Sequence, residues 1–333
     1  MYPKKLKKGA TFGIVALSSP SKYELLVQGK ANLEKLGYKV IIGKSCTSDY
    51  AGYLSGDDDL RANDLNNMFK DKTIDAIMCL KGGYGTPRIV DKIDYKMIKN
   101  NKKIFIGFSD VTLLLNTIYD RCNLITYHGP MLAIDFKDSY NKTSLDSFND
   151  IVIKQSRNYL INKDNIYNIK TIGKGIAKGI IVGGNLSLID VMIGTPYQLD
   201  FNNKILLIEE INEEVYQVDR MLQKLRLSGI LSVLKGIIIG GITYKKAENK
   251  EYGYYELFKE ILEPLNIPVL YGLPIGHVTP RLTIPIGAEV EINTFEFTLK
   301  IIWNFYNIFW IYQMTIKNMR FIISYFLCFN ILN

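Results

Sequence analysis

Short apolar runs alternate with longer amphipathic stretches along the first half of the chain. In the short runs nearly every position is hydrophobic, whereas the longer stretches space their hydrophobic residues at helical intervals. The pattern predicts strands over residues 11–17, 39–42, 74–80, 104–107 and 124–127, with helices over 23–36, 57–69, 87–93 and 111–120 between them. Such alternation is typical of a parallel sheet with helices on both faces. Ligand sites in these sheets lie beyond the carboxyl ends of the strands.

The second half repeats this alternation after a polar stretch. Residues 135–168 are rich in Asn, Asp, Ser and Lys, and we interpret them as a helix and a crossing between two units. Strands are expected over 175–182, 205–208, 236–239, 268–271 and 288–292, helices over 186–193, 215–228 and 254–265, and a turn at Gly183-Gly184-Asn185. We therefore expect an N-terminal domain over 1–150, a linker over 151–168 and a smaller, more mixed α/β domain over 169–302.

The last segment, residues 303–333, differs from the rest of the sequence. It holds both tryptophans, it is rich in Phe, Ile and Tyr, and its charged residues are Lys317 and Arg320. The apolar run 301–316 contains polar residues and falls short of the roughly 20 residues that a clean membrane span needs. Two interpretations remain open: a helix that contacts a membrane surface, or an appended segment that packs on the body or aggregates.

Composition and charge exclude several functional classes. With 47% hydrophobic and 22% charged residues among 333, the chain is expected to be globular. The formal charge of +8 arises from lysines scattered along the chain without an arm or stripe, which argues against a nucleic-acid partner. Four widely spaced cysteines and two histidines favour neither a disulfide framework nor a metal cluster, so we expect no metal or cofactor. The basic N-terminus leads into a short apolar run without a cleavage site, so we expect a cytoplasmic protein.

The sharpest candidate for chemistry is Ser109. The apolar run 104–107 leads into Phe108-Ser109-Asp110, and a helical pattern follows at once. A serine on such a strand-to-helix turn has its hydroxyl lifted above the sheet edge, and the N–H of the next residue, Asp110, is placed to meet an oxyanion. The alternative is a plain helix cap, since Ser and Asp are common before helices and capping needs no catalysis.

A glycine turn, Lys81-Gly82-Gly83-Tyr84-Gly85, follows another apolar strand. Such a turn lets the backbone N–H groups at Gly82 and Gly83 point at an anionic ligand or a tetrahedral intermediate. The turn does not match the dinucleotide fingerprint, because Arg88 occupies its last position, and it lacks the Lys-Ser/Thr ending of a phosphate loop. A tight turn without function explains the glycines equally well.

Acid and base candidates come from the second half. A buried strand ends in Glu209 and Glu210, and a carboxylate there can orient an imidazole, although solvated charge at a strand end is the simpler interpretation. His277 lies in a Gly/Pro-rich loop, where it is well placed to act as an accessible base. His128 is the competitor, and it either fixes a loop by hydrogen bonding or lines the site. With Ser109, these residues supply a nucleophile, an acid and a base in the chain order Ser, Glu, His.

Further motifs occur in order along residues 6–299. They are Gly56-Asp57-Asp58-Asp59 with Arg61, Gly82-Gly83-Tyr84-Gly85 with Arg88, Gly107-Phe108-Ser109-Asp110, His128-Gly129-Pro130-Met131, Gly183-Gly184-Asn185-Leu186, Gly194-Thr195-Pro196-Tyr197, Glu209 with Tyr216 and Asp219-Arg220-Met221-Leu222, and Gly276-His277 followed by Pro285-Ile286-Gly287. At these residues the chain resembles the LD-carboxypeptidase family, serine peptidases that include cytoplasmic murein tetrapeptide carboxypeptidases and microcin C immunity peptidases.

The resemblance implies a role for each candidate. Ser109 is the implied nucleophile, His277 the general base and acid, and Glu209 the carboxylate that orients the imidazole. The implied oxyanion donors are the backbone N–H of Asp110 and one N–H from the turn Gly82-Gly83, of which the second glycine is our first choice because it lies nearer the apex.

The implied fold pairs an N-terminal Rossmann-like parallel-sheet domain with a smaller C-terminal mixed α/β domain of the swivelling type, usually as a homodimer. The implied substrate is a murein tetrapeptide cleaved before its terminal D-alanine. Arg88 and Tyr84 are candidates for gripping its carboxylates, and a structural role for Arg88 is an equal alternative. The alternative functions are a microcin C-type immunity peptidase acting on peptidyl-adenylate-like toxins and a non-catalytic α/β binding protein. The chain departs from the family at Arg281, where many members carry Asn, and in the tail 303–333.

Overall fold

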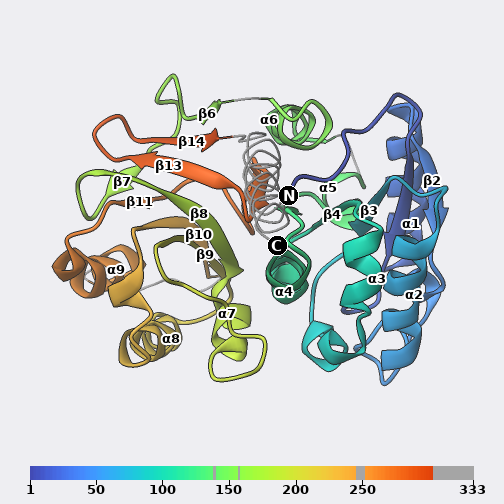
Figure 1. The fold of residues 1–333 in the computed structure, drawn as a ribbon, viewed down its shortest axis with the longest axis horizontal. Coiled ribbons are helices and arrows are strands. Elements are labelled where there is room, and N and C mark those ends of the chain that lie inside the picture. The colour runs from blue at the N-terminus through green and yellow to red at the C-terminus, as the bar shows by residue number, and fades with distance from the viewer. Residues whose placement is uncertain (138–139, 157, 245–251, 303–333) are drawn as a thin grey trace, which may run out of the picture.

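The computed structural model describes residues 1–137, 140–156, 158–244 and 252–302, which form two sheets with flanking helices (Figure 1). The first sheet has six strands in the order β12-β5-β4-β3-β1-β2. These are β1 (Thr11–Val15), β2 (Lys39–Ile42), β3 (Ala76–Cys79), β4 (Ile104–Gly107), β5 (Thr126–His128) and β12 (Ile284–Ile286). Strands β1 to β5 are parallel, and β12 runs antiparallel beside β5.

Helices contribute apolar side chains to both faces of the first sheet. One cluster includes residues of α1 (Tyr23–Lys35), α5 (Leu132–Asp135) and α6 (Lys142–Phe148), and the other includes residues of α2 (Asp58–Lys70), α3 (Tyr95–Asn100) and α4 (Thr112–Cys122). Successive side chains of β3 alternate between the clusters, with Ala76 and Met78 in the first and Ile77 and Cys79 in the second. Because the strand is buried on both faces, its sequence is a continuous apolar run.

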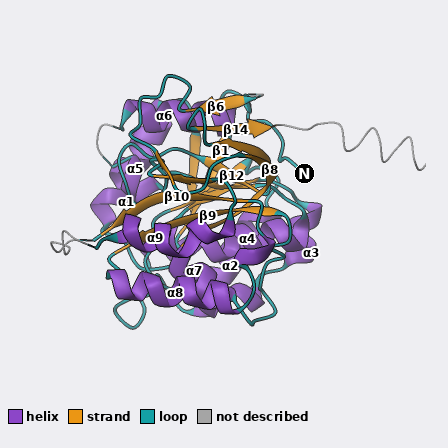
Figure 2. Ribbon diagram, turned by 90° about the vertical axis from the view of Figure 1, so that its left-hand side faces the viewer, coloured by secondary structure: helices purple, strands orange, loops and turns teal. Residues whose placement is uncertain are grey.

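The second sheet has eight strands in the order β6-β14-β13-β8-β9-β10-β11-β7. These are β6 (Tyr159–Ile161), β7 (Lys170–Thr171), β8 (Ile176–Asn185), β9 (Lys204–Ile211), β10 (Gly236–Thr243), β11 (Val269–Tyr271), β13 (Glu289–Asn293) and β14 (Thr298–Ile302). Strands β8 to β11 are parallel and the others antiparallel. Helices α7 (Leu186–Met192), α8 (Val215–Leu227) and α9 (Tyr254–Leu262) lie on one side of these strands (Figure 2). This mixed α/β architecture confirms the predicted fold class.

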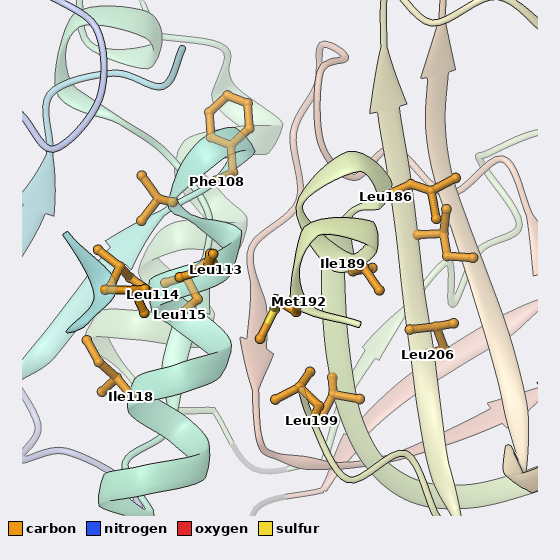
Figure 3. Packing of buried hydrophobic residues seen from close by; sticks show 14 of the residues in the cluster. Phe108, Leu113, Leu114, Leu115, Ile118, Leu186, Ile189, Met192, Leu199 and Leu206 are labelled. Carbon is orange, nitrogen blue, oxygen red and sulfur yellow. The ribbon is translucent and has the colours of Figure 1, made fainter. Parts of the chain in front are cut away.

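The two sheets are joined by packing and by backbone pairing. Figure 3 shows leucines of α4 on one side of a shared apolar cluster, and Ile189 and Met192 of α7 on the other. Asn116 of α4 bonds both backbone groups of Gly183 in β8, with its Nδ2 2.9 Å from the carbonyl oxygen and its Oδ1 2.8 Å from the amide nitrogen. Strand β12 returns the later chain to the first sheet. These contacts hold the two sheets against each other.

Two local predictions were wrong. Strand β8 continues through Gly183-Gly184-Asn185, where a turn was expected. A Cβ added at Gly184 would lie 2.7 Å from Thr112 Oγ1 and 3.1 Å from His128 Cδ2, so this glycine serves close packing of the first domain on the strand. The helix expected over 87–93 is replaced by two 3₁₀ turns, Thr86–Arg88 and Val90–Lys92.

Several elements were not expected, among them α3, β6, β7, β12 and β14. Strand β12 is short and has a proline at its centre, so it has no strand signal. Strand β6 lies within the expected linker 151–168 and pairs with β14. Among the described residues, no helix is both long and apolar enough to cross a membrane. The predicted tail 303–333 lies outside the described residues.

Candidate active site

Ser109 lies two residues after the end of β4 and adopts a left-handed backbone conformation. Its φ is 64°, in a region that residues other than glycine rarely occupy. A 3₁₀ turn over Ser109–Val111 then leads into α4. Gly107 allows this tight geometry, because a Cβ added there would lie 3.0 Å from Val111 Cγ1 and 3.2 Å from Cys79 Sγ. An ordinary N-cap residue has extended backbone angles, so the strained turn favours the interpretation of Ser109 as a presented nucleophile.

Three predicted side chains meet where the two sheets face each other. His277 Nε2 lies 3.1 Å from Ser109 Oγ, and His277 Nδ1 lies 2.7 Å from Glu209 Oε2. Glu209 comes from β9 and His277 from the loop after β11. Both distances are hydrogen-bond lengths. The arrangement can move a proton from the serine hydroxyl to the imidazole, while the carboxylate determines which ring nitrogen carries the hydrogen.

A bulge in β10 admits the loop that carries His277. The register between β9 and β10 shifts between Ile239 and Ile242, and within the bulge the Gly241 amide donates to the Ile275 carbonyl at 2.8 Å. Gly276, which follows Ile275 in this loop, has φ +87°, and a Cβ added there would overlap Glu209 Oε2. Only a residue without a side chain therefore lets the histidine loop approach the carboxylate this closely.

Glu209 is fully buried and negatively charged. Burial alone raises the pKa of a carboxyl group, but interactions with His128 and His277 outweigh it and lower the pKa of Glu209 to about 2. The neighbouring Glu210 is also buried, and its carboxylate is used elsewhere: it accepts from Asn185 Nδ2 at 2.8 Å and from the hydroxyl of Ser187 at 2.7 Å. Of the two acids left open by the sequence, Glu209 is the one that faces His277.

His128 lies behind the same carboxylate. Its Nε2 is 3.6 Å from Glu209 Oε1, longer than a hydrogen bond, and within the described residues neither atom has a hydrogen-bond partner. The ring is completely buried, and its centroid lies 5.9 Å from that of Phe108. His128 thus lines the site from inside the protein, whereas His277 contacts the serine. The sequence left both positions open, and its motif around His128 gave no sign of contact with Glu209.

The glycine turn lies beside Ser109. A Cβ added at Gly82 would lie 2.7 Å from Ser109 Oγ and 3.7 Å from the Asp110 amide nitrogen. Gly83 has φ +126° and packs against Ser19 instead. The α-carbon of Gly82 therefore faces the serine hydroxyl, whereas that of Gly83 faces Ser19.

Asp110 ties the serine turn to the glycine turn. Its carboxylate accepts from Ser18 Oγ at 2.5 Å and from the Thr86 amide at 2.9 Å, and its carbonyl accepts from Thr86 Oγ1 at 2.6 Å. Burial raises the pKa of Asp110, and these hydrogen bonds oppose the shift. The side chain thus has a structural task, which leaves the backbone amide as its predicted contribution to an oxyanion site.

The two predicted substrate-binding residues differ in their surroundings. Arg88 forms a bidentate ion pair with Asp58, with its Nε and Nη2 at 2.8 and 2.9 Å from the carboxylate oxygens. Tyr84 is 49% exposed, and its ring centroid lies 6.2 Å from that of Tyr53. Arg88 therefore has a structural partner already, whereas Tyr84 presents a largely open aromatic face.

Arg61 has a role that the sequence did not reveal. It is fully buried and donates to three loop carbonyls, those of Gly56 at 3.1 Å, Leu17 at 2.6 Å and Gly85 at 2.9 Å. The motif Gly56-Asp57-Asp58-Asp59 with Arg61 was a usable signal, because a buried arginine close to glycine turns often satisfies their carbonyl groups. No cluster of three or more potential metal ligands occurs among the described residues.

Comparisons with known proteins identify relatives over most of the chain. Models of the N-terminal and C-terminal domains of LD-carboxypeptidases match residues 12–129 and 178–292. A probable murein peptide carboxypeptidase of Bacillus subtilis is 36% identical over 301 residues, which cover 89% of this chain and 92% of the relative. The microcin C7 self immunity protein MccF superposes with a TM-score of 0.84 at 28% identity, over 91% of this chain and 98% of MccF. The muramoyltetrapeptide carboxypeptidase of Oxalobacter formigenes gives a TM-score of 0.78 at 24% identity, over 88% and 99%, and supports the fold.

Proposed function

Because the chain belongs to the LD-carboxypeptidase family, we propose that it is a serine carboxypeptidase that hydrolyses the L,D amide bond before the terminal D-alanine of murein tetrapeptides. The observation that carries this proposal is the pair of contacts from His277, at 3.1 Å to Ser109 Oγ and 2.7 Å to Glu209 Oε2. The murein peptide carboxypeptidase of Bacillus subtilis supports the choice of substrate class.

Ser109 performs the first chemical step. Its Oγ attacks the carbonyl carbon before D-alanine, and His277 Nε2 takes the hydroxyl proton. The amide N–H of Asp110 and one from Gly82-Gly83 donate to the oxyanion. His277 then returns the proton to the departing amine, which releases D-alanine and leaves an acyl ester on the serine. Water, deprotonated by the same imidazole, hydrolyses the ester.

Glu209 keeps the imidazole in its working state throughout. Its carboxylate accepts from the protonated Nδ1 of His277, so that Nε2 is left as the acceptor for the serine proton. When the ring gains that proton, the buried negative charge stabilises the imidazolium. The pKa of Glu209, lowered to about 2, keeps this charge in place across the working pH range.

Substrate binding involves the rim of the glycine turn. Tyr84, which lies in the glycine turn, and the neighbouring Tyr53 offer exposed aromatic faces. Since Arg88 uses Nε and Nη2 for Asp58, a substrate carboxylate would bind it at Nη1. The proposal includes a homodimer in the cytoplasm, which light scattering of the purified protein and cell fractionation test.

The second candidate is a microcin C-type immunity peptidase. The observation that favours it is the superposition on MccF, with a TM-score of 0.84. Both candidates use the same catalytic residues and differ in the leaving part of the substrate. Purified protein assayed on a murein tetrapeptide and on a peptidyl-adenylate analogue separates them: D-alanine release supports the first candidate, and cleavage of the analogue alone supports the second.

The same assay tests catalysis itself. Ser109→Ala is expected to abolish turnover while the circular dichroism spectrum and melting temperature stay unchanged. Ser232→Ala, at a serine in the turn before β10 whose hydroxyl donates to the Gly229 carbonyl, is the matched control and is expected to retain activity. If the wild type shows no turnover and Ser109→Ala does not differ from it, the chain is a binding protein that keeps the scaffold of a peptidase. Turnover by Ser109→Ala at the wild-type rate would show that another residue is the nucleophile.

A further inference from the structure

Arg281 lies buried in the loop after His277 and contacts both halves of the site. Its side chain is 7% exposed. The guanidinium Nε donates to the carbonyl of Gly276 at 2.6 Å, and Nη1 donates to Asp135 Oδ1. The same group stacks on Phe108, with its central carbon 3.9 Å from the ring centroid.

Each of these partners stands next to a reacting residue or anchors the first domain. Gly276 immediately precedes His277, and Phe108 immediately precedes Ser109. Asp135 ends α5, and its second oxygen accepts from the Met131 amide at 2.9 Å. One planar group therefore links the histidine loop, the nucleophile turn and a helix of the first domain.

The ring of Phe108 transmits this contact to the imidazole. Phe108 is almost fully buried and meets His277 edge to face, with the ring centroids 5.0 Å apart. The guanidinium and His277 thus contact the same phenyl ring. A movement of the guanidinium therefore shifts the phenyl ring against which the imidazole packs.

We propose that Arg281 is a positioning residue that sets the distance between His277 and Ser109 through its contacts with Gly276, Phe108 and Asp135. The inference rests on the proposed function, because it assigns Arg281 a part in activating the same serine. A purely structural ion pair is the alternative. Loss of a purely structural ion pair lowers stability but leaves the rate of a folded variant unchanged, whereas a shift of about 1 Å between reacting groups lowers rates by roughly 100-fold.

Only the guanidinium of arginine can make these three contacts at once. Two divergent N–H donors and a flat stacking face are needed at once, and the ammonium of lysine offers neither the plane nor the fixed fork. Arg281→Lys keeps the positive charge but not this geometry, and Arg281→Met keeps the apolar stem alone. Asp135→Asn keeps an oxygen acceptor of the same size and removes the negative charge.

Arg121 provides a matched control at the other end of α4. It also joins the two domains, since it stacks on Tyr95 and Tyr197 and donates to the Pro196 carbonyl at 3.1 Å. It lies about 14 Å along the helix from Thr112, where α4 begins beside the serine turn. Arg121→Met is expected to leave activity unchanged.

The test measures how fast a small fluorophosphonate labels Ser109, together with kcat and KM on the tetrapeptide. Labelling needs a serine activated by His277 but no peptide substrate. We expect Arg281→Met and Arg281→Lys to label at least tenfold more slowly, with kcat reduced similarly and KM unchanged, and Asp135→Asn to show a smaller loss. Melting temperatures show whether each variant is folded, and if Arg281→Met does not fold, the Arg281→Lys and Asp135→Asn variants decide.

Wild-type labelling and kcat in folded Arg281 variants would overturn the inference, as would an equal loss in Arg121→Met. A wild-type protein that is labelled at Ser109 but does not cleave the tetrapeptide contradicts the proposed substrate. The labelling rates of the variants then test the positioning role of Arg281 by themselves. A wild-type serine that is not labelled overturns both.

Discussion

Glu209→Gln is the substitution that tests the electrostatics of the site most sharply. The site lowers the pKa of this carboxyl from 4.5 to about 2, and at about 1.4 kcal/mol per pKa unit this favours the charged form by roughly 3 kcal/mol. Glutamine has nearly the same shape without the charge. It also presents an amide N–H toward His277 Nδ1, which leaves the hydrogen on Nε2, where the ring cannot accept the serine proton.

Both effects lower kcat and leave substrate contacts intact. Loss of charge alone predicts a decrease of about 100-fold, and the wrong tautomer extends it toward about 10,000-fold. The assay is D-alanine release from the tetrapeptide at neutral pH, with kcat and KM determined separately. Glu210→Gln is the matched control, because that carboxylate faces Asn185 and Ser187, and its kcat should stay within a few-fold of wild type. A Glu209→Gln variant that retains a third of the wild-type kcat refutes the reasoning.

Three further outcomes follow from the same contacts. Gly82→Ala places a Cβ 2.7 Å from Ser109 Oγ, so initial rates should fall at least 100-fold in a folded protein. A near-wild-type rate would show that the backbone of the glycine turn shifts to accommodate the methyl group. His128→Gln removes an imidazole that lowers the pKa of Glu209, so kcat should fall about tenfold. An unchanged kcat would show that the ring of His128 serves packing alone. Since the folded pKa of Glu209 is depressed, its stabilisation is present above about pH 4.5 and lost as the pH falls toward 2. The free energy of unfolding, measured in urea, should therefore be higher for the wild type than for Glu209→Gln by up to roughly 3 kcal/mol at pH 7, and this difference should close toward pH 2. A difference that does not depend on pH contradicts the lowered pKa of Glu209.

Local patterns were sufficient for the nucleophile turn. Ser109 follows a fully apolar strand and precedes a helical repeat, and both elements depend on neighbouring residues alone. The strands β2 and β4 have the predicted bounds for the same reason. The positive φ of Ser109 was not predicted, and neither was the close approach of Gly107 to Cys79 and Val111 that accompanies it.

Contacts between distant segments escaped prediction from local patterns. Glu209 and Glu210 are adjacent in the sequence, and only the path of β9 across the sheet turns the first toward His277. Gly183-Gly184 has the composition of a turn, but it lies in β8 because the first domain packs on it. The family motifs pointed to Glu209 and His277, since they encode an arrangement in space that no single segment carries, and the two side chains lie 2.7 Å apart.

The central claim is that Ser109 is a nucleophile activated by His277, and covalent labelling tests it most directly. The protein is treated with a fluorophosphonate, and the adduct is mapped by peptide mass spectrometry while residual D-alanine release is followed. We expect one adduct, on Ser109, that grows in proportion to the lost activity and forms far more slowly in His277→Ala. An adduct on another residue, or full activity with Ser109 completely labelled, would contradict it.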